Sequence, residues 1–512
     1  MTKPFYITTP LYYVNAKPHI GHAYTNILCD TFARYRRFRG EEVFFLTGTD
    51  EHGTKIDRAA RELGKEPQVY VNEMVPQFKE LWDILGIQYD YFIRTTDQNH
   101  KKAVANILRD LETKGEIYKA SYKGWYCIPC ESFWTKLQLV EGKCPDCHRE
   151  VQALEEENYF FKLSKHQDWL IQYIMKENPN FVRPETRKNE ILGFLRQPLE
   201  DLCITRPRAR LAWGIDYPTS KEHVVYVWFD ALINYVSAVG FSLDEKKFKK
   251  LWPADIHVVG KDILRHHTVY WPIMLKAMGA QMPKTVLAHG WWTMSGTKVS
   301  KSRGNVVDPI KLVKKYGVDA FRYFLLREVT IGFDGAFSED LLAERYTTDL
   351  ANDFGNLWFR LVSMLDKYFD GAIPQFDSTS LSPGMAGLFK NVDRAMSDYD
   401  PRTALGTIWA VIKQTNLYIE EKKPWVVAKD LARKKELAQD MGILAERLAH
   451  LAVLLLPFLP TTAEKILGRF KLQKEWAIKI AGDFAKPFLK LGTKVDRGEA
   501  LFPRLDEEKV AK

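Results

Sequence analysis

Two histidines follow the first apolar segment of the chain, in residues 18–22, which read Pro-His-Ile-Gly-His. The N-terminus of a helix offers unpaired N–H groups and the positive end of the helix dipole, and both attract phosphate. Gly21 would let a ligand approach the backbone closely, and His19 and His22 could donate hydrogen bonds to phosphate oxygens. The two histidines could equally be a metal-binding pair or packed surface residues, so this motif alone leaves the choice open.

A basic motif lies far downstream, where residues 298–302 read Lys-Val-Ser-Lys-Ser. Gly296 and Gly304 flank it, which predicts a mobile loop. Lys298 and Lys301 could hold a triphosphate and neutralise the charge that grows on a leaving pyrophosphate. Such a run is more usually a solvated basic loop. The occurrence of the histidine motif upstream in the same chain is what favours a phosphate site.

Four cysteines form two close pairs, Cys127 with Cys130 and Cys144 with Cys147, separated by thirteen residues. Four thiolates at this spacing fit a tetrahedral zinc site, and four sulfurs leave no open position for water. We therefore predict one structural zinc ion. The alternatives are thiols without metal or disulfides, and His148 could compete with Cys147 as a ligand.

Length and composition limit the class of protein. At roughly 150 residues per domain, 512 residues predict about three domains. Six cysteines are too few for a disulfide framework, and we expect Cys29 and Cys203 to be core residues. The longest apolar run is ten residues, against about 20 for a membrane span, and we expect no leader peptide, because a strand-like segment begins at residue 5. We expect a cytoplasmic protein, and its net charge of +9 weakly favours a nucleic-acid partner.

The order of the elements predicts an α/β fold. Strand-like segments at 5–9 and 43–47 flank a helical segment at 25–37, as in a βαβ unit of a parallel sheet. Similar strands return at 224–229, 257–259 and 286–288, after a different stretch at 119–215 that holds the cysteine pairs. We interpret this as a Rossmann-like sheet split by a zinc-knuckle insertion.

The last third of the chain is predicted to be helical. Apolar residues recur at spacings of three and four, while 371–387 resembles a loop. Residues 411–490 hold 15 lysines and arginines against 9 acidic residues, which solvated helix faces would explain equally well as a nucleic-acid partner. The apolar positions are Leu405, Ile408, Trp409, Ile412, Leu444, Leu448, Leu451 and Leu455.

The histidine and lysine motifs together resemble the HIGH and KMSKS signatures of class I aminoacyl-tRNA synthetases, and in particular the methionyl-tRNA synthetase family. The resemblance extends over residues 5 to about 505. It includes five separated stretches in the family's order: residues 9–15 (Thr-Pro-Leu-Tyr-Tyr-Val-Asn), 48–53 (Gly-Thr-Asp-Glu-His-Gly), 227–231 (Val-Trp-Phe-Asp-Ala), 260–263 (Gly-Lys-Asp-Ile) and 423–425 (Lys-Pro-Trp).

This resemblance implies a two-step reaction. Methionine and ATP, with Mg²⁺, form methionyl-adenylate, and the methionyl group then passes to the terminal ribose of a methionine tRNA. Neither step needs a protein nucleophile, so catalysis is mostly positioning and charge stabilisation. The implied catalytic residues are His19, His22, Lys298 and Lys301, and the implied ATP-binding residues add Gly21, Gly260 and Asp262.

The resemblance also implies a methionine pocket of apolar and aromatic residues, with Asp50 as the partner of the α-ammonium group. Without the resemblance, Trp228 and Tyr235, seven residues apart, would be ordinary core on a helix face. The chain departs from the family at Val299, where methionine is usual, and at His266, where many relatives carry phenylalanine. The other implied pocket residues are Leu11, Tyr13, Ala231 and His267.

On the tRNA side, Trp425 resembles the tryptophan that stacks on an anticodon base, and Asn356 and Arg360 resemble the pair that reads this base. A tryptophan after proline is otherwise often a helix-start packing residue. The resulting domains are a catalytic fold in two parts (1–118 and 216–295), the insertion (119–215), a KMSKS and stem-contact region (296–345) and an all-α anticodon-binding bundle (346–512).

Two alternatives remain at this point. One is another class I synthetase, for cysteine, valine, leucine or isoleucine, although the insertion is short for an editing domain. The other is a non-catalytic zinc-knuckle RNA-binding protein, which the paired phosphate motifs disfavour. The absence of an appended C-terminal domain weakly predicts a monomer.

Overall fold

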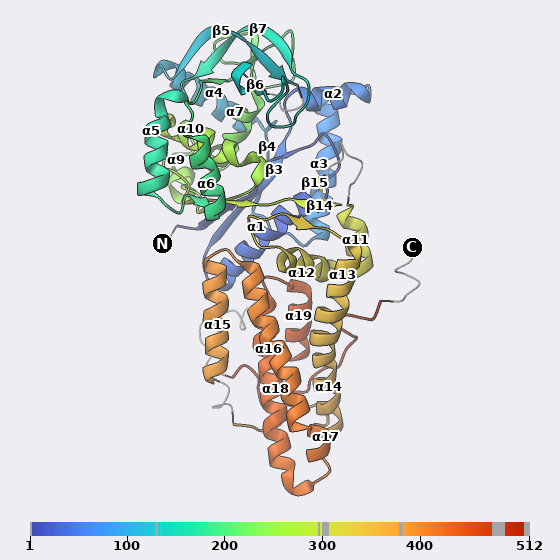
Figure 1. Ribbon diagram of the computed structural model, residues 1–512. Coiled ribbons are helices and arrows are strands. Elements are labelled where there is room, and N and C mark those ends of the chain that lie inside the picture. The colour runs from blue at the N-terminus through green and yellow to red at the C-terminus, as the bar shows by residue number, and fades with distance from the viewer. Residues whose placement is uncertain are drawn as a thin grey trace. The chain divides into compact units, whose positions relative to one another are not determined.

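The computed structural model describes residues 3–128, 132–134, 136–294, 297–298, 307–377, 382–473 and 487–505 (Figure 1). The chain divides into two compact units. The first comprises Met1–Pro18, Val43–Leu81 and Gln88–Gly290, and the second comprises His19–Glu42, Trp82–Ile87 and Trp291–Lys512. In the described residues, no helix is both long enough and apolar enough to span a membrane.

A parallel sheet forms the centre of the first unit. Its order is β2-β3-β1-β12-β13-β8, and β4 pairs with β3. These short runs of apolar residues are buried, as in Ile7, Phe45 and Val258, which is typical of parallel strands. The bounds are β1 Phe5–Thr8, β2 Tyr12–Tyr13, β3 Val43–Asp50, β4 Tyr91–Arg94, β8 Val182–Arg183, β12 Ile256–Gly260 and β13 Thr285–His289.

The predicted strands at 5–9, 43–47, 257–259 and 286–288 are confirmed, but the strand predicted at 224–229 is wrong. Only His223–Val225 (β11) is extended, and it pairs antiparallel with Thr205–Pro207 (β10) outside the parallel sheet. Residues Val227–Leu232 form helix α7 instead. A short apolar run that is buried has the same sequence pattern in a strand and in a helix, so periodicity could not separate the two.

The stretch predicted as an insertion contains a four-stranded antiparallel sheet, in the order β6-β5-β7-β9. Its strands are β5 Ile117–Cys127, β6 Ser132–Trp134, β7 Gln152–Phe161 and β9 Leu202–Cys203. The same stretch also supplies β8 to the parallel sheet. The helices of the first unit are α2 Thr54–Glu62, most of α3 Pro67–Ile84, α4 Gln98–Thr113, α5 Gln167–Gln172, α6 Glu185–Phe194, α7, α8 Asn234–Ser237, α9 Glu245–Leu251 and α10 Trp271–Met278.

The second unit is mainly helical. It combines α1 (Ile20–Phe38), a small sheet in the order β15-β14-β16 and the helices of the last third of the chain. The strands are β14 Trp292–Met294, β15 Thr297–Lys298 and β16 Gly335–Ala336. The helices are α11 Pro309–Tyr316, α12 Val318–Glu328, α13 Glu339–Arg345, the π-helix Tyr346–Gly355, α14 Asn356–Phe369, α15 Ser382–Ser397, α16 Pro401–Lys422, α17 Pro424–Val427, α18 Lys434–Leu455 and α19 Pro460–Arg469.

The predicted apolar positions of α16 and α18 are all buried. The loop predicted at 371–387 is too long, because α15 already begins at Ser382. Pro383 lies in the first turn of that helix, where its missing N–H costs nothing. The chain is therefore a mixed α/β protein with a parallel sheet and a helical C-terminal region.

Candidate active site, metal site and tRNA-contact residues

His19 and His22 cap the N-terminus of α1. The Nδ1 atom of His19 accepts a hydrogen bond from the Gly21 amide at 3.1 Å, and the Nδ1 atom of His22 accepts one from the His19 amide at 3.1 Å. The two rings stack with their centroids 4.0 Å apart. Because a backbone N–H donates to Nδ1 in both rings, each neutral imidazole carries its proton on Nε2. Two N–H donors are thereby fixed at a helix N-terminus, where phosphate is favoured.

Gly21 packs closely against the imidazole of His19. A Cβ atom at this position would lie 3.0 Å from Cε1 and 3.2 Å from Nδ1 of His19. A larger residue would therefore push this imidazole, which accepts the residue-21 amide, by a few tenths of an ångström.

A buried ion pair anchors α1 within the second unit. Asp30 Oδ2 lies 2.7 Å from Nη1 of Arg322 on α12, and both side chains are fully buried. Arg322 also donates to the carbonyl oxygens of Pro457 and Phe458, at 3.2 and 3.0 Å. Breaking such a pair leaves an uncompensated buried charge at a cost of about 3–5 kcal/mol, so α1 is held in a fixed register.

The first unit presents Asp50 at the carboxyl end of β3, the edge where parallel sheets bind ligands. Gly48 permits the pairing of β3 with β4, because a Cβ atom there would lie 2.0 Å from the Ile93 carbonyl oxygen. Glu51 is fully buried and accepts two hydrogen bonds from Arg94, at 2.7 and 2.8 Å. The hydroxyl of Thr96 donates to the same carboxylate at 2.6 Å. This clamp fixes the backbone beside Asp50, which is itself buried.

Tyr235 and His267, two of the predicted pocket residues, are in contact. The Tyr235 hydroxyl lies 2.7 Å from His267 Nε2, and His267 Nδ1 lies 2.8 Å from the Ile263 carbonyl oxygen. Because a carbonyl only accepts, His267 carries its proton on Nδ1, and Tyr235 donates to Nε2. Burial lowers the pKa of His267 to about 4, so this ring is neutral at neutral pH.

Trp228 on α7 stacks on His266, with ring centroids 3.8 Å apart and an angle of 22° between the planes. Burial lowers the pKa of His266 to about 3, so a neutral aromatic ring packs against the tryptophan. His266 therefore presents a flat, uncharged ring to Trp228. Among the other predicted pocket residues, Ala231 is buried, Leu11 packs against the core, and Tyr13 lies in β2 with Lys55 Nζ 4.9 Å from its ring centroid.

Gly260 is the last residue of β12, and Asp262 follows in a short 3₁₀ turn. A Cβ atom on Gly260 would lie 2.6 Å from Asp262 Oδ1, so only glycine lets this carboxylate lie over the backbone. The segment lies at the same edge of the sheet as Asp50, since all strands of this sheet pair in parallel.

Lys298 is the second residue of β15, opposite Thr293 of β14. Lys301, Val299 and the flanking Gly296 and Gly304 lie outside the described residues. Of the predicted catalytic and ATP-binding residues, His19, Gly21, His22 and Lys298 belong to the second unit, and Gly260 and Asp262 belong to the first.

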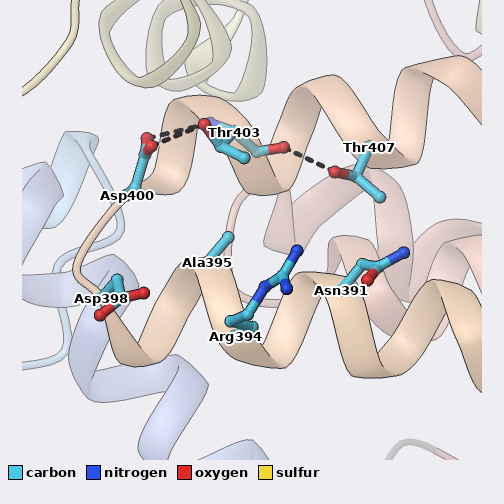
Figure 2. Close-up of a pocket in the computed structure, with 7 residues that line it drawn as sticks. All are labelled: Asn391, Arg394, Ala395, Asp398, Asp400, Thr403 and Thr407. Carbon is cyan, nitrogen blue, oxygen red and sulfur yellow. Dashed lines mark hydrogen bonds between the residues drawn. The ribbon is translucent and has the colours of Figure 1, made fainter.

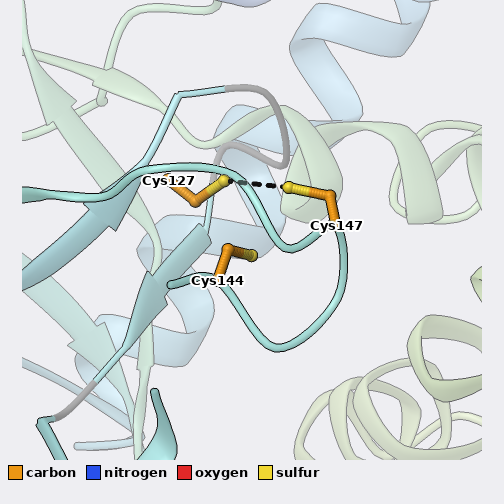
Figure 3. A group of neighbouring side chains, drawn as sticks. All are labelled: Cys127, Cys144 and Cys147. Carbon is orange, nitrogen blue, oxygen red and sulfur yellow. Dashed lines mark hydrogen bonds between the residues drawn. The ribbon is translucent and has the colours of Figure 1, made fainter. Parts of the chain in front are cut away.

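Three of the four predicted metal ligands lie together at the end of β5 (Figure 3). The sulfur atoms of Cys127, Cys144 and Cys147 all lie within 4.8 Å of one another, and those of Cys127 and Cys147 are 3.5 Å apart. In a tetrahedral site with Zn–S bonds of about 2.3 Å, sulfurs lie roughly 3.8 Å apart, so this set fits zinc. Cys130 lies outside the described residues, and the group includes Cys147 rather than His148.

The predicted tRNA residues meet on the helical region. Asn356 begins α14 and is exposed, and Arg360 follows one turn later. The Arg360 guanidinium lies 5.8 Å from the ring centroid of Trp425 and donates to Glu420 at 2.6 Å. Trp425 keeps 38% of its surface exposed, which is unusual for a tryptophan that serves only as packing.

A polar cavity of about 290 Å³ lies between α15 and α16 (Figure 2). Arg394 and Asp398 line it, together with Asp400, which caps α16 by accepting from the Thr403 amide at 3.0 Å. No predicted site residue lines this cavity. Of its polar residues, Asp400 and Thr403 form the cap of α16.

Two family models match nearly the whole chain. The model for class I tRNA synthetases of the methionine type matches residues 5–154 and 150–362. The model for the anticodon-binding domain of methionyl-tRNA ligase matches residues 371–512. The chain belongs to the methionyl-tRNA synthetase family. Members of this family are aminoacyl-tRNA ligases, and neither alternative from the sequence is favoured.

Individual methionyl-tRNA synthetases agree with this assignment. The methionine–tRNA ligase of Caldanaerobacter subterraneus is 48% identical over 99% of the chain, which covers 80% of that relative's own length. The structure is similar to that of Mycobacterium tuberculosis methionyl-tRNA synthetase in complex with methionyl-adenylate, with a TM-score of 0.93 and 38% identity over 98% of this chain and 100% of that one. The TM-score against the free form is 0.87, with 35% identity over 99% of each chain.

Sequence reasoning gave no role to several buried or partly buried polar residues of the first unit. Glu51 and His52 lie within a motif that was matched, but neither was given a role. Asp230 lies within the matched stretch 227–231 and was also given no role, and Arg94 and His100 lie outside the matched stretches. Asp230 offered one signal, because a carboxylate in the apolar segment 227–232 must find partners when it is buried.

Proposed function

We propose that this chain is the methionine–tRNA ligase that its family membership indicates, charging a methionine tRNA for translation initiation and elongation. The observation that carries the proposal is the match of both family models across the chain. In the first step, a carboxylate oxygen of methionine bonds to the α-phosphorus of ATP, and the bond to the β-phosphate breaks to release pyrophosphate. In the second, a hydroxyl of the terminal tRNA ribose attacks the methionyl carbonyl carbon, and AMP leaves.

For the first step, we assign phosphate binding to Gly21 and to the Nε2–H groups of His19 and His22, whose rings are oriented by the cap of α1. Lys298 and Lys301 would neutralise the leaving pyrophosphate. Gly260 and Asp262 would hold the adenosine ribose. Mg²⁺, which prefers phosphate oxygens, would enter with ATP and offset part of its charge.

For methionine, we assign the α-ammonium group to the buried carboxylate of Asp50. The thioether would lie among aromatic and apolar side chains, which favour sulfur contacts. These are Leu11, Tyr13, Trp228, Ala231, Tyr235 and His267.

Zinc would be held by Cys127, Cys130, Cys144 and Cys147, and would tie the two ends of the knuckle together. Burial raises the pKa of the Cys144 thiol to about 11, so metal binding would release a proton there. Such a site needs reduced cysteines, which supports action in the cytoplasm. A monomeric state stays a prediction that sedimentation would test.

The proposed function is tested by ATP–pyrophosphate exchange with purified protein and each of methionine, cysteine, valine, leucine and isoleucine. We expect exchange with methionine, and charging only of a methionine tRNA. Exchange with another of these amino acids but not with methionine would contradict the proposal.

Trp425→Ala should leave methionine-dependent exchange unchanged and reduce tRNA charging. Stacking of a base on an aromatic ring contributes about 1–3 kcal/mol, so kcat/KM for tRNA should fall roughly 10- to 100-fold. Phe333→Ala, which removes an aromatic side chain that is 59% exposed elsewhere in the second unit, is the matched control and should charge normally. Equal loss of both steps in Trp425→Ala would count against the anticodon role.

Cys144→Ser should lower the zinc content of the purified protein below one ion per chain, because a hydroxyl is a poor zinc ligand. Cys203→Ser is the control, since its thiol lies outside the cysteine group and should not affect metal content. Metal analysis by mass spectrometry is the measurement. Unchanged zinc in Cys144→Ser would exclude the knuckle.

A further inference from the structure

Asp230 on α7 lies between two imidazoles inside the first unit. Its Oδ2 atom is 2.7 Å from His52 Nδ1, and its Oδ1 atom is 2.6 Å from His100 Nε2. All three side chains are at most 2% exposed. A buried carboxylate is costly unless its oxygens are paired, and here both oxygens are.

The direction of these hydrogen bonds follows from the charge on Asp230. Burial alone would raise the pKa of Asp230, but His52 and His100 outweigh it and hold this pKa below its usual value. The group is therefore an ionised acceptor, and both imidazoles donate to it. His100 is in turn fixed by Ser237, whose hydroxyl lies 2.7 Å from His100 Nδ1.

This network joins the chain segments that carry the proposed methionine-binding residues. His52 follows Asp50 by two residues, beyond the Glu51 clamp at the end of β3. Asp230 lies between Trp228 and Ala231 on α7. The other two partners come from α4 and from α8, the helix that also carries Tyr235.

We propose that Asp230 is a positioning residue for the amino-acid site of this enzyme, a role that rests on the proposed function. By binding His52 on one side and His100 on the other, it fixes the distance between Asp50 and the α7 wall of the pocket. The ammonium group and the side chain of methionine can then be bound together without reorganising the protein.

Asp230→Asn tests the proposal, because asparagine keeps the shape but can accept a hydrogen bond through only one oxygen. Its amide N–H would face the other imidazole, which must change its tautomer or lose the bond. A hydrogen bond to a charged group is worth about 1.5–3 kcal/mol, so we expect the KM for methionine to rise roughly 10- to 100-fold. The KM for ATP should not change.

Glu116→Gln is the matched control. Glu116 is also a buried carboxylate of the first unit, paired with Lys165 and with His166 Nε2 at 3.1 Å, but it precedes β5 and joins no pocket segment. We expect wild-type KM values for both substrates in this variant. Thermal unfolding of both variants separates loss of fold from loss of positioning.

A second pair of variants addresses the case in which Asp230→Asn fails to fold. His100→Gln keeps an N–H donor near the position of Nε2 and should keep the KM for methionine close to the wild-type value, whereas His100→Ala should raise it. Histidine-selective NMR should show exchange-protected imidazole N–H signals that shift in His100→Ala.

Three results would overturn the proposal while leaving the function intact. They are an unchanged methionine KM in Asp230→Asn, a parallel rise of the KM values for methionine and ATP, and equal methionine KM values in the two His100 variants. If the wild-type protein shows no methionine-dependent exchange, the proposed function itself fails.

Discussion

Replacing His22 by alanine or by asparagine should slow the formation of methionyl-adenylate by about 10²–10³-fold, the usual effect of removing one donor that stabilises charge in a transition state. The Nδ1 atom of His22 accepts the His19 amide, so Nε2 is the ring nitrogen that carries the N–H donor. Asparagine can replace the acceptor but does not reach the position of Nε2. Glutamine can supply an N–H near that position, so His22→Gln should lose less. Single-turnover adenylate formation at saturating ATP and methionine is the measurement.

The cap of α1 provides the control for this experiment. Losing the side-chain acceptor in His22→Ala should also cost about 1 kcal/mol of unfolding free energy, whereas His22→Asn should keep most of it. If the rate of adenylate formation depends on the Nε2–H group, the His22→Asn variant should be as stable as the wild type and still react slowly. A fast His22→Asn enzyme would show that His22 acts only as a capping residue.

Asp50→Asn should weaken methionine binding strongly. Asp50 is buried at the carboxyl end of β3, and an amide there cannot balance the positive charge of the α-ammonium group. Removing one partner of a buried charge pair costs about 3–5 kcal/mol, so the KM for methionine should rise by roughly 10²–10³-fold or more. The binding of ATP measured without methionine should be unaffected.

Asp90→Asn is the matched control for Asp50→Asn. Asp90 is bonded to β3 near the start of this strand, whereas Asp50 is the last residue of β3. Asp90 accepts a hydrogen bond from the Phe45 amide at 2.7 Å, and an asparagine oxygen can accept it as well. This variant should lose little stability and no methionine affinity. Equal methionine KM values in Asp50→Asn and Asp90→Asn would refute the ion pair.

Part of the local structure around the proposed site could be predicted from local sequence. Helix α1 begins one residue after His19, so the spacing of His19, Gly21 and His22 is sufficient to place them in a cap. The predicted strands at 5–9 and 43–47 were found because their apolar runs are short and bounded. The cysteine spacing predicted a cluster, and three sulfurs meet there.

Local sequence could not predict the network around Asp230. Its partners, His52 and His100, are 178 and 130 residues away, and no periodicity connects them. The same limit applies to Arg322, whose buried partner Asp30 is on α1. A buried charge is tolerated only where distant segments supply its partners, and the sequence does not record which segments meet.

The sequence by itself therefore determined the family, the helix that follows the histidine motif, four of the seven strands of the parallel sheet (β1, β3, β12 and β13) and the cysteine cluster, because these depend on residues close together along the chain. The tertiary structure decided that residues 227–232 form a helix, that His266 stacks on Trp228, and that Asp230 joins four segments around the proposed pocket. These outcomes depend on burial and on hydrogen-bond partners, which exist only once the chain has packed.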